Sequence, residues 1–279
     1  MVTKKKSILI YTIITLVLIL MLFWWLGDRW YVNYAPVQPF LIYYGGIPTQ
    51  NKQITTFVDQ LTGYPIVILG DGLSDSAPSS SIIRLAKKSS PNIAFFGYIS
   101  IGVTHQAGNL SVNEVKSLLK QWKQIGASGV LYDTAGPDFG VSYKRLSQLV
   151  ALAHQYGMRI IVNSWYPQAV LHVGLTRHDG YLAENWYVAE GHVRSQPVGA
   201  SYISLIKQEG IPIFMTATGG SHIQSLSLPT IKAWVKGSKK VAQGNYIAIS
   251  DQYYSSDTDY IESAKTLKNI IRSFFPFGL

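Results

Sequence analysis

Short apolar runs and amphipathic stretches alternate along most of the chain. Eight runs rich in β-branched and aromatic residues recur, each followed by a turn and then by helical periodicity. The predicted strands are Phe40–Gly45, Ile66–Gly70, Ile93–Ile101, Gly129–Asp133, Arg159–Asn163, Gly180–Glu184, Pro212–Ala217 and Tyr246–Asp251. Because these runs are apolar throughout and alternate with helices, they predict a parallel sheet covered on its outer faces. Eight such units in about 240 residues favour a closed (β/α)8 TIM barrel over an open sheet.

Four segments between and after these strands have the periodicity of amphipathic helices. The segment Val112–Ile125 is the best defined, because Ser111 and Glu114 form a predicted capping box ahead of its apolar stripe. The others are Ser142–Tyr156, Leu228–Val241 and Asp259–Phe274. No G-x-G-x-x-G motif follows the first strand, which disfavours a dinucleotide-binding fold.

The beginning of the chain has a different pattern. Residues 4–6 are all lysine, and the following run Ser7–Leu26 is uncharged and long enough to span a bilayer. The lysines predict that the N-terminus stays in the cytoplasm. A cleaved signal peptide or a buried core helix is the alternative, although no good cleavage site follows the run. We therefore expect a single-pass signal anchor in the cell membrane over residues 1–27, a tether over 28–38 and an extracytoplasmic barrel over 39–279.

The composition of the chain excludes or disfavours several classes of function. The net charge is +9, and the cationic residues are scattered, which suits a solvated surface near anionic polymers better than a nucleic-acid groove. The chain has no cysteine, so disulfides, thiol catalysis and cysteine-based metal sites are excluded. Its six histidines lack paired spacing, and we expect neither a metal nor another cofactor.

Carboxylates follow or end all four even-numbered strands of the predicted barrel. They are Asp71, Asp133, Glu184 and Asp251. The active sites of such barrels lie at the carboxyl ends of the strands, and alternate strands contribute side chains to one layer, so these four could converge. Converging acids repel one another, which raises at least one pKa and allows a protonated acid beside an ionised base. A single strand-end acid would more often cap a helix or bind loop amides.

Aromatic residues surround the same predicted rim. Trp165 and Trp186 lie in loops past their strands, where core packing is less expected, whereas packing alone could explain Tyr43 or Tyr98. Tyrosine and tryptophan combine an apolar face with a hydrogen-bonding edge, which matches a pyranose ring. The predicted substrate-binding residues are Asp71, Asp251, Tyr43, Tyr98, Asn163, Trp165, Trp186, Tyr253 and His222.

Part of this pattern resembles a known superfamily. The segments Gly126–Asp133 (GASGVLYD), Tyr143–Tyr156, Arg159–Asn163 (RIIVN) and Gly180–Glu184 are similar to the spherulin-4-like glycoside hydrolases. That superfamily includes endo-α-1,4-polygalactosaminidases and hydrolases of galactosaminogalactan and Pel-type exopolysaccharides. The resemblance implies that the Asp ending the fourth strand and the Glu ending the sixth, Asp133 and Glu184, form the catalytic pair. Many members have a second acid after the first, where this chain has Thr134.

The sequence therefore predicts an endo-acting glycoside hydrolase of an extracellular hexosamine-containing polysaccharide. Asp133 is preferred as general acid/base and Glu184 as nucleophile, while the strand spacing allows either a retaining or an inverting mechanism. The polysaccharide, the membrane and exopolysaccharide synthesis proteins are the expected partners, and nucleic acid is not. The alternative, favoured by Thr134, is a non-catalytic glycan-binding or scaffold barrel of an exopolysaccharide synthesis complex. A deacetylase would need metal ligands, and the sequence shows none.

Overall fold

The computed structural model describes residues 12–22, 37–70, 72–74, 77–104, 107–194, 199–218, 228–241 and 245–250. It divides into two units, Met1–Ala35 and Pro36–Leu279. In the first unit, residues 12–22 are helical. Within the described part of the chain, no helix combines the length and the apolar character needed to cross a membrane.

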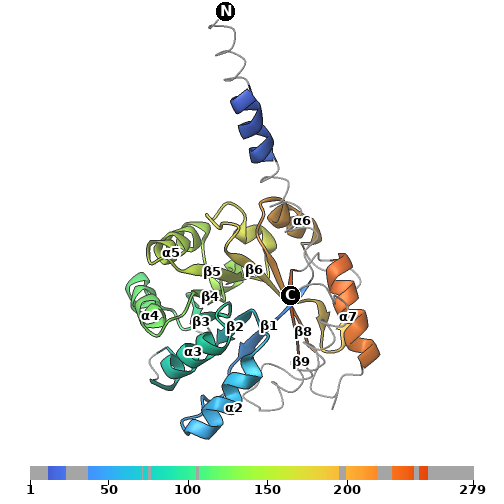
Figure 1. Cartoon of the computed structure of the whole chain (residues 1–279). Helices are drawn as coiled ribbons and strands as arrows, with labels where there is room; N and C mark the ends of the chain where they lie inside the picture. Colours follow the sequence, from blue (N-terminus) through green and yellow to red (C-terminus); the bar gives the residue numbers. More distant parts are fainter. Residues whose placement is uncertain are drawn as a thin grey trace, which may run out of the picture. The chain divides into compact units, whose positions relative to one another are not determined.

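The second unit is a closed barrel of eight parallel strands with helices around it, which confirms the predicted TIM barrel (Figure 1). Strands β1 to β5 pair in sequence order, β1 also pairs with β9, β9 with β8 and β8 with β6, and a β5–β6 pairing closes the ring. The barrel strands are β1 Gln38–Tyr43, β2 Ile66–Leu69, β3 Ala94–Ser100, β4 Gly129–Asp133, β5 Arg159–Asn163, β6 Gly180–Ala189, β8 Ile213–Thr218 and β9 Tyr246–Ser250.

Helices lie outside the barrel and follow its strands in the chain (Figure 1). The capping box at Ser111 and Glu114 is present at the start of α4, and the helix predicted at Leu228–Val241 has those bounds as α7. The helix predicted at Asp259–Phe274 lies outside the described residues. The helices are α2 Asn51–Leu61, α3 Ala77–Ser89, α4 Val112–Gln124, α5 Tyr143–Gln155, α6 Ala200–Gln208 and α7, with 3-10 turns η1 Pro137–Phe139 and η2 Pro167–Val170.

Strand alternation divides the core into an inner and an outer part. Residues such as Ile42, Phe96 and Leu131 fill the inside of the barrel. Their strand neighbours, such as Tyr43 and Val130, pack outward beneath the helices. Side chains of a strand alternate between its two faces. Whether the odd or the even positions of a strand point inward, here called its parity, therefore decides which residues reach the barrel's mouth. Asp133 and Glu184 have the inward parity of Leu131 and Leu182, their neighbours two residues before.

Strand β6 differs from the sequence prediction. It continues past Glu184 to Ala189, and its register against β8 shifts between Ala183 and Val188. A two-residue turn then leads into the short antiparallel strand β7, His192–Val193, which is an addition to the eight barrel strands. A bulge of this kind bends a strand and re-aims its side chains, and bulges are common next to active sites. Glu184 lies within this irregular part of β6.

Candidate active site

Three side chains from neighbouring strands meet at the carboxyl end of the barrel. The Asn163 amide at the end of β5 donates one hydrogen bond to Asp133 Oδ1 and one to Glu184 Oε2, each 2.7 Å long. Asn163 itself is buried, with 8% of its surface exposed. The sequence predicted these residues for the site, and the structure brings the two acids together through an amide from the odd-numbered strand between them.

The shared amide limits the distance between the two acids. Both oxygens lie 2.7 Å from the same nitrogen of Asn163, so they can be separated by at most twice that distance, about 5.4 Å. Carboxyl groups of retaining glycosidases lie about 5–5.5 Å apart, and those of inverting enzymes about 6.5–9.5 Å. The bound applies to the nearest pair of oxygens and is compatible with the retaining spacing.

The two carboxylates have different surroundings. Asp133 accepts hydrogen bonds on both oxygens, from Asn163 and from the Tyr98 hydroxyl, which lies 2.5 Å from Oδ2. The Tyr98 ring packs edge-on against Tyr44, with centroids 5.8 Å apart, and the Trp122 indole donates to the Tyr98 carbonyl oxygen. Two donated hydrogen bonds suit an ionised carboxylate, which only accepts.

Glu184 is the more desolvated acid of the pair. Burial raises the pKa of Glu184, the Asn163 hydrogen bond opposes that shift, and the nearby Asp133 charge adds to it. Desolvation and a neighbouring like charge both disfavour the ionised form of a carboxylic acid. The arrangement therefore keeps a proton on Glu184 at a higher pH than on an ordinary glutamic acid, beside a carboxylate that is hydrogen-bonded on both oxygens.

Each acid is followed by a residue in the left-handed backbone region. Thr134 has φ +53° and Asn185 has φ +46°. The Thr134 hydroxyl donates to the Asp133 carbonyl oxygen, accepts from the Gly102 amide and lies 2.8 Å from Ser100 Oγ. A positive φ is unfavourable for a β-branched residue and persists only where its surroundings hold it. Thr134 therefore ties the ends of β3 and β4 together directly beside Asp133.

The residue after Glu184 is anchored in a similar way. The Asn185 backbone amide donates a hydrogen bond to Thr216 Oγ1 on β8, at 2.8 Å. The position of Glu184 is thus set by the β6 bulge and by this bond to the adjacent strand. Neither Asn185 nor Thr216 was predicted as a supporting residue. Their position at or next to the ends of their strands was the signal available.

The other predicted aromatic residues are divided between the mouth and the core. Trp165 lies in the loop after β5 with 46% of its surface exposed, and Arg194 lies over its ring at 5.5 Å. Trp186 was expected in a loop, and this is wrong, because it lies within β6, is 4% exposed and belongs to the outer core. Along the extended strand, buried Trp186 and Val188 alternate with less buried neighbours.

The structure also places Tyr43 away from the mouth. It points outward from β1, is 6% exposed, packs against Phe57 of α2 and donates to the Gly46 carbonyl oxygen at 2.8 Å. The expectation that Tyr43 lies at the substrate rim is therefore wrong, because Ile42 and not Tyr43 has the inward parity. A cavity of about 660 Å³ beside Tyr43 is lined by Ile47, Lys52 and other residues of the β1–α2 segment, on the helix side of β1.

Four predicted site residues lie outside the described residues and stay predictions. They are Asp71, His222, Asp251 and Tyr253. No group of three or more histidine, aspartate or glutamate side chains among the described residues is placed to hold a metal ion.

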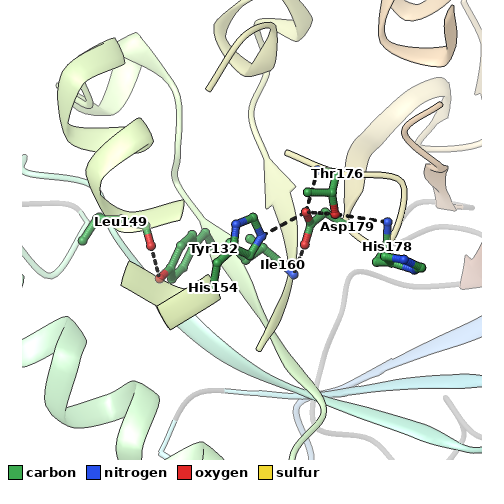
Figure 2. A network of polar contacts seen from close by, with 7 residues as sticks. All are labelled: Tyr132, Leu149, His154, Ile160, Thr176, His178 and Asp179. Carbon is green, nitrogen blue, oxygen red and sulfur yellow. Dashed lines mark hydrogen bonds and ion pairs between the residues drawn. The ribbon is translucent and has the colours of Figure 1, made fainter. Parts of the chain in front are cut away.

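A second carboxylate network lies just before the start of β6 (Figure 2). Asp179 is 3% exposed and accepts at Oδ1 from the Ile160 amide of β5, and at Oδ2 from the amide and hydroxyl of Thr176. His154 Nε2, near the end of α5, lies 3.0 Å from Oδ2. Backbone amides and side chains of three segments thus meet at one buried carboxylate. This network fixes the amino end of β6 to β5 and α5.

Comparison with known proteins supports the fold. No protein-family model matches the chain, and no curated protein matches it significantly. The glycoside hydrolase domain of PelA from Pseudomonas aeruginosa superposes with a TM-score of 0.54 at 13% identity, over 79% of this chain and 96% of that one. A deoxyribose phosphate aldolase from Aeropyrum pernix gives 0.50 at 14% identity, over 89% and 94% of the two chains. A D-psicose 3-epimerase gives 0.51 at 10% identity, over 87% and 99%. At these identities, the three likenesses show that the chain shares the barrel fold of proteins with different chemistries.

Proposed function

We propose that this chain is a glycoside hydrolase that cleaves its substrate with Asp133 and Glu184. The observation that carries the proposal is the Asn163 amide shared by two carboxylates of unlike surroundings. One acid is hydrogen-bonded on both oxygens and suited to the ionised form, and burial favours the protonated form of the other. An acid and an anion at this separation are what hydrolysis of a glycosidic bond with retention of configuration requires.

Glu184 is the general acid/base and Asp133 the nucleophile in this proposal. The raised pKa of Glu184 favours the proton donor, and the two donors to Asp133 favour the ionised nucleophile. This assignment reverses the one preferred from the sequence. The sequence could show that both acids end strands, but not that one is more deeply desolvated than the other.

The reaction then has two steps. Glu184 gives its proton to the glycosidic oxygen while Asp133 attacks the anomeric carbon, so the bond to the leaving sugar breaks and a glycosyl ester forms. In the second step the Glu184 carboxylate takes a proton from water, whose oxygen attacks the same carbon and releases Asp133. Both groups end in their starting protonation states, and the product keeps the configuration of the substrate.

The proposed substrate is an extracellular polysaccharide that contains hexosamine, cleaved within the chain. The resemblance of Gly126–Glu184 to spherulin-4-like hydrolases supports the sugar class, and exposed Trp165, two residues after Asn163, supports a pyranose ligand. The likeness to the PelA hydrolase domain is one of fold and is consistent with the proposal. Proteins of exopolysaccharide synthesis are proposed partners.

A non-catalytic glycan-binding or scaffold barrel is the second candidate. Thr134 favours it, because this residue stands where many related hydrolases have a second acid, and its hydroxyl is used within the protein. The two candidates differ in whether bonds are broken. A scaffold would bind the polymer without forming new reducing ends.

The deciding experiment measures reducing ends released by the full chain from amino-sugar polymers of known acetylation. The proposal expects release that is lost in Glu184→Gln, and proton NMR should show the configuration of the first product to be retained. Binding without release would establish the glycan-binding candidate instead. An inverted first product would remove Asp133 as nucleophile while leaving the chain a hydrolase.

We also propose that residues 1–27 anchor the barrel to the outer side of the cell membrane. The lysines at 4–6 and the uncharged run after them support this topology. Protease added to spheroplasts should remove the barrel and spare the first residues. A mature N-terminus near Ala35 would instead show that the segment is a cleaved signal peptide.

A further inference from the structure

The rim of the mouth carries a cation that the hydrolytic pair does not use. Arg194 follows β7, and its guanidinium carbon lies 5.5 Å from the centre of the Trp165 ring. No described carboxylate lies within ion-pair distance of that guanidinium. An exposed cation–π contact of this kind stabilises a protein only weakly, so protein stability gives little reason for it.

Trp165 follows closely in the chain after Asn163, the residue that bridges the two acids. It lies two residues beyond Asn163, and two residues of extended chain span at most about 7 Å. The loop is fixed on each side of the indole: buried Ser164 accepts at its carbonyl oxygen from the Tyr181 hydroxyl, at 2.8 Å, and Pro167 is buried at the start of η2. The backbone that carries the indole is therefore fixed beside the site.

Arg194 is presented by an equally defined segment. Its amide donates to the Tyr187 carbonyl oxygen at 2.9 Å, which continues the β6–β7 hairpin. The turn of the hairpin is bonded to the end of β8, because the Gly191 amide donates to the Thr218 carbonyl oxygen and the Glu190 amide to its hydroxyl. The hairpin is an addition to the barrel, and it places a cation at the mouth.

The chemistry of this pair identifies a ligand class. A guanidinium held over an indole face can still donate from the N–H groups along its edge, in the geometry that binds a carboxylate or a phosphate with two hydrogen bonds. The indole supplies apolar surface for the C–H face of a sugar ring. The net charge of the chain is positive, like that of the guanidinium: it is +9 overall and about +6 past Arg29. A positive surface draws anionic polymers to the mouth.

We infer that Trp165 and Arg194 form a subsite for a sugar carrying an anionic group, next to the bond that Asp133 and Glu184 cleave. This inference rests on the proposed function and narrows its substrate to an acidic polysaccharide that contains hexosamine. The anionic group binds at the rim, where Arg194 lies, and the uncharged acetal lies at the acids. A fully cationic amino-sugar polymer would place an ammonium group against Arg194 and is disfavoured.

The test measures binding by the full chain in the Glu184→Gln background, so that hydrolysis does not enter. The probes are hexamers of galacturonic acid, of N-acetylglucosamine and of glucosamine, with a short polyglycerol phosphate to separate phosphate from carboxylate recognition. We expect an acidic probe to bind at least about 10-fold more tightly than the neutral hexamer, a difference of about 1.4 kcal/mol. Arg194→Ala should weaken binding of the acidic probe at least about 10-fold more than binding of the neutral hexamer. Arg194→Lys should keep part of the acidic preference, because a point charge remains.

Lys120→Ala is the matched control, since Lys120 is an exposed cation on α4 and its removal changes the net charge equally. The inference is overturned if the glucosamine hexamer binds best, if no acidic probe binds, or if Lys120→Ala and Arg194→Ala have equal effects. Equal weakening of acidic and neutral binding by Arg194→Ala would also overturn it, because the arginine would then only hold the indole. If the acidic preference holds but the unmutated chain releases no reducing ends, the hydrolase proposal fails and the subsite stands.

Discussion

Two carboxylates flank the regular part of β6 and differ in how many hydrogen bonds they accept. Asp179, just before the strand, accepts four hydrogen bonds, two of them from backbone amides, and His154 is among its partners (Figure 2). Glu184, where the strand becomes irregular, accepts one described hydrogen bond, from Asn163. Both lie in surroundings that penalise an unpaired charge, and only Asp179 has enough donors to offset that penalty.

The difference shows which buried acid belongs to the scaffold and which to the site. A carboxylate surrounded by donors stabilises the native state, because the free energy gained from its hydrogen bonds exceeds the free-energy cost of removing it from water. A carboxylate left short of donors lowers stability, and such positions are concentrated where chemistry is done. Barrels of this class separate the two roles by end, with stability at the amino ends of the strands and activity at the carboxyl ends. Substitution of the acid at the carboxyl end of β6 should therefore lower activity and not stability, whereas substitution of the acid at the amino end should lower stability and not activity.

The largest expected effect is on activity at the mouth. Glu184→Gln and Asp133→Asn should each reduce reducing-end release at neutral pH by about 10²–10⁴-fold, the range that proton transfer alone contributes. Glu184→Gln nearly preserves side-chain shape and removes a carboxylate that is short of donors, so its thermal unfolding should be unchanged or shifted upward. Asp138→Asn, on the exposed turn η1, is the control and should keep its activity. A Glu184→Gln variant that melts several degrees lower and still cleaves would make Glu184 a structural residue.

The opposite result is expected at the other end of β6. Asp179→Asn replaces one acceptor oxygen by an amide that faces N–H or O–H donors, and this should lower the free energy of unfolding by about 3 kcal/mol or more. For a chain of this size, the midpoint of unfolding should fall by about 6–12 °C. Activity per folded molecule, measured well below the transition, should stay within a few-fold.

The control for that substitution is Asp59→Asn, an exposed carboxylate on α2. It should shift the midpoint by less than a degree or two, since surface substitutions usually change stability by no more than about 0.5 kcal/mol. If Asp179→Asn were as stable as Asp59→Asn, the Asp179 network would have no role in fixing β6. The separation of roles between the two ends of the strand would then be lost.

A smaller effect is expected from Tyr98, which distinguishes the two acids of the mouth. Tyr98→Phe keeps the ring against Tyr44 and removes the hydroxyl that donates to Asp133 Oδ2. A hydrogen bond to a charged group contributes about 1.5–3 kcal/mol, so kcat should fall by about 10–100-fold. KM should change little if the hydroxyl acts through Asp133. A change confined to KM would instead place Tyr98 on the substrate.

The parts of the fold that sequence predicts well are those set by local chemistry. The helix start after Ser111 follows from a side chain that caps nearby amides, and this predicted cap is present. Continuous apolar runs locate the strands for the same kind of reason, because parallel strands are buried on both faces. That burial also hides the parity of a strand, which is why Tyr43 could not be distinguished from an inward residue.

The site was predictable in its acids but not in their environment. Asp133 and Glu184 end apolar runs and are visible as such, whereas Asn163 bridges them through contacts that no local pattern encodes. The bulge in β6 resets the alternation after Glu184, so the sequence could not show that Trp186 is in the core. Arg194 lies on a hairpin outside the eight-unit repeat, and a search of strand ends does not reach it.

The smallest expected effect is a pH dependence of stability that belongs to Glu184. Its pKa is raised in the folded protein by burial, so between the unfolded and the folded pKa the native state holds a proton that the unfolded state has lost. The free energy of unfolding therefore falls as pH rises from the ordinary glutamate value of about 4.3 through the folded pKa, and is level above it. Glutamine cannot ionise, and Glu184→Gln should not show this fall.

The quantity to measure is the difference in the free energy of unfolding between Glu184→Gln and the unmutated chain. Glu184→Gln should be more stable than the unmutated chain at pH 7, by about 0.5–2 kcal/mol, and this advantage should shrink as pH is lowered towards 4. Denaturant unfolding at several pH values between 4 and 7.5 measures the difference at each pH. If the advantage of glutamine grows towards acid, the ionised form of Glu184 is the one that the fold stabilises, and Glu184 resembles Asp179 rather than the proton donor of the proposed mechanism.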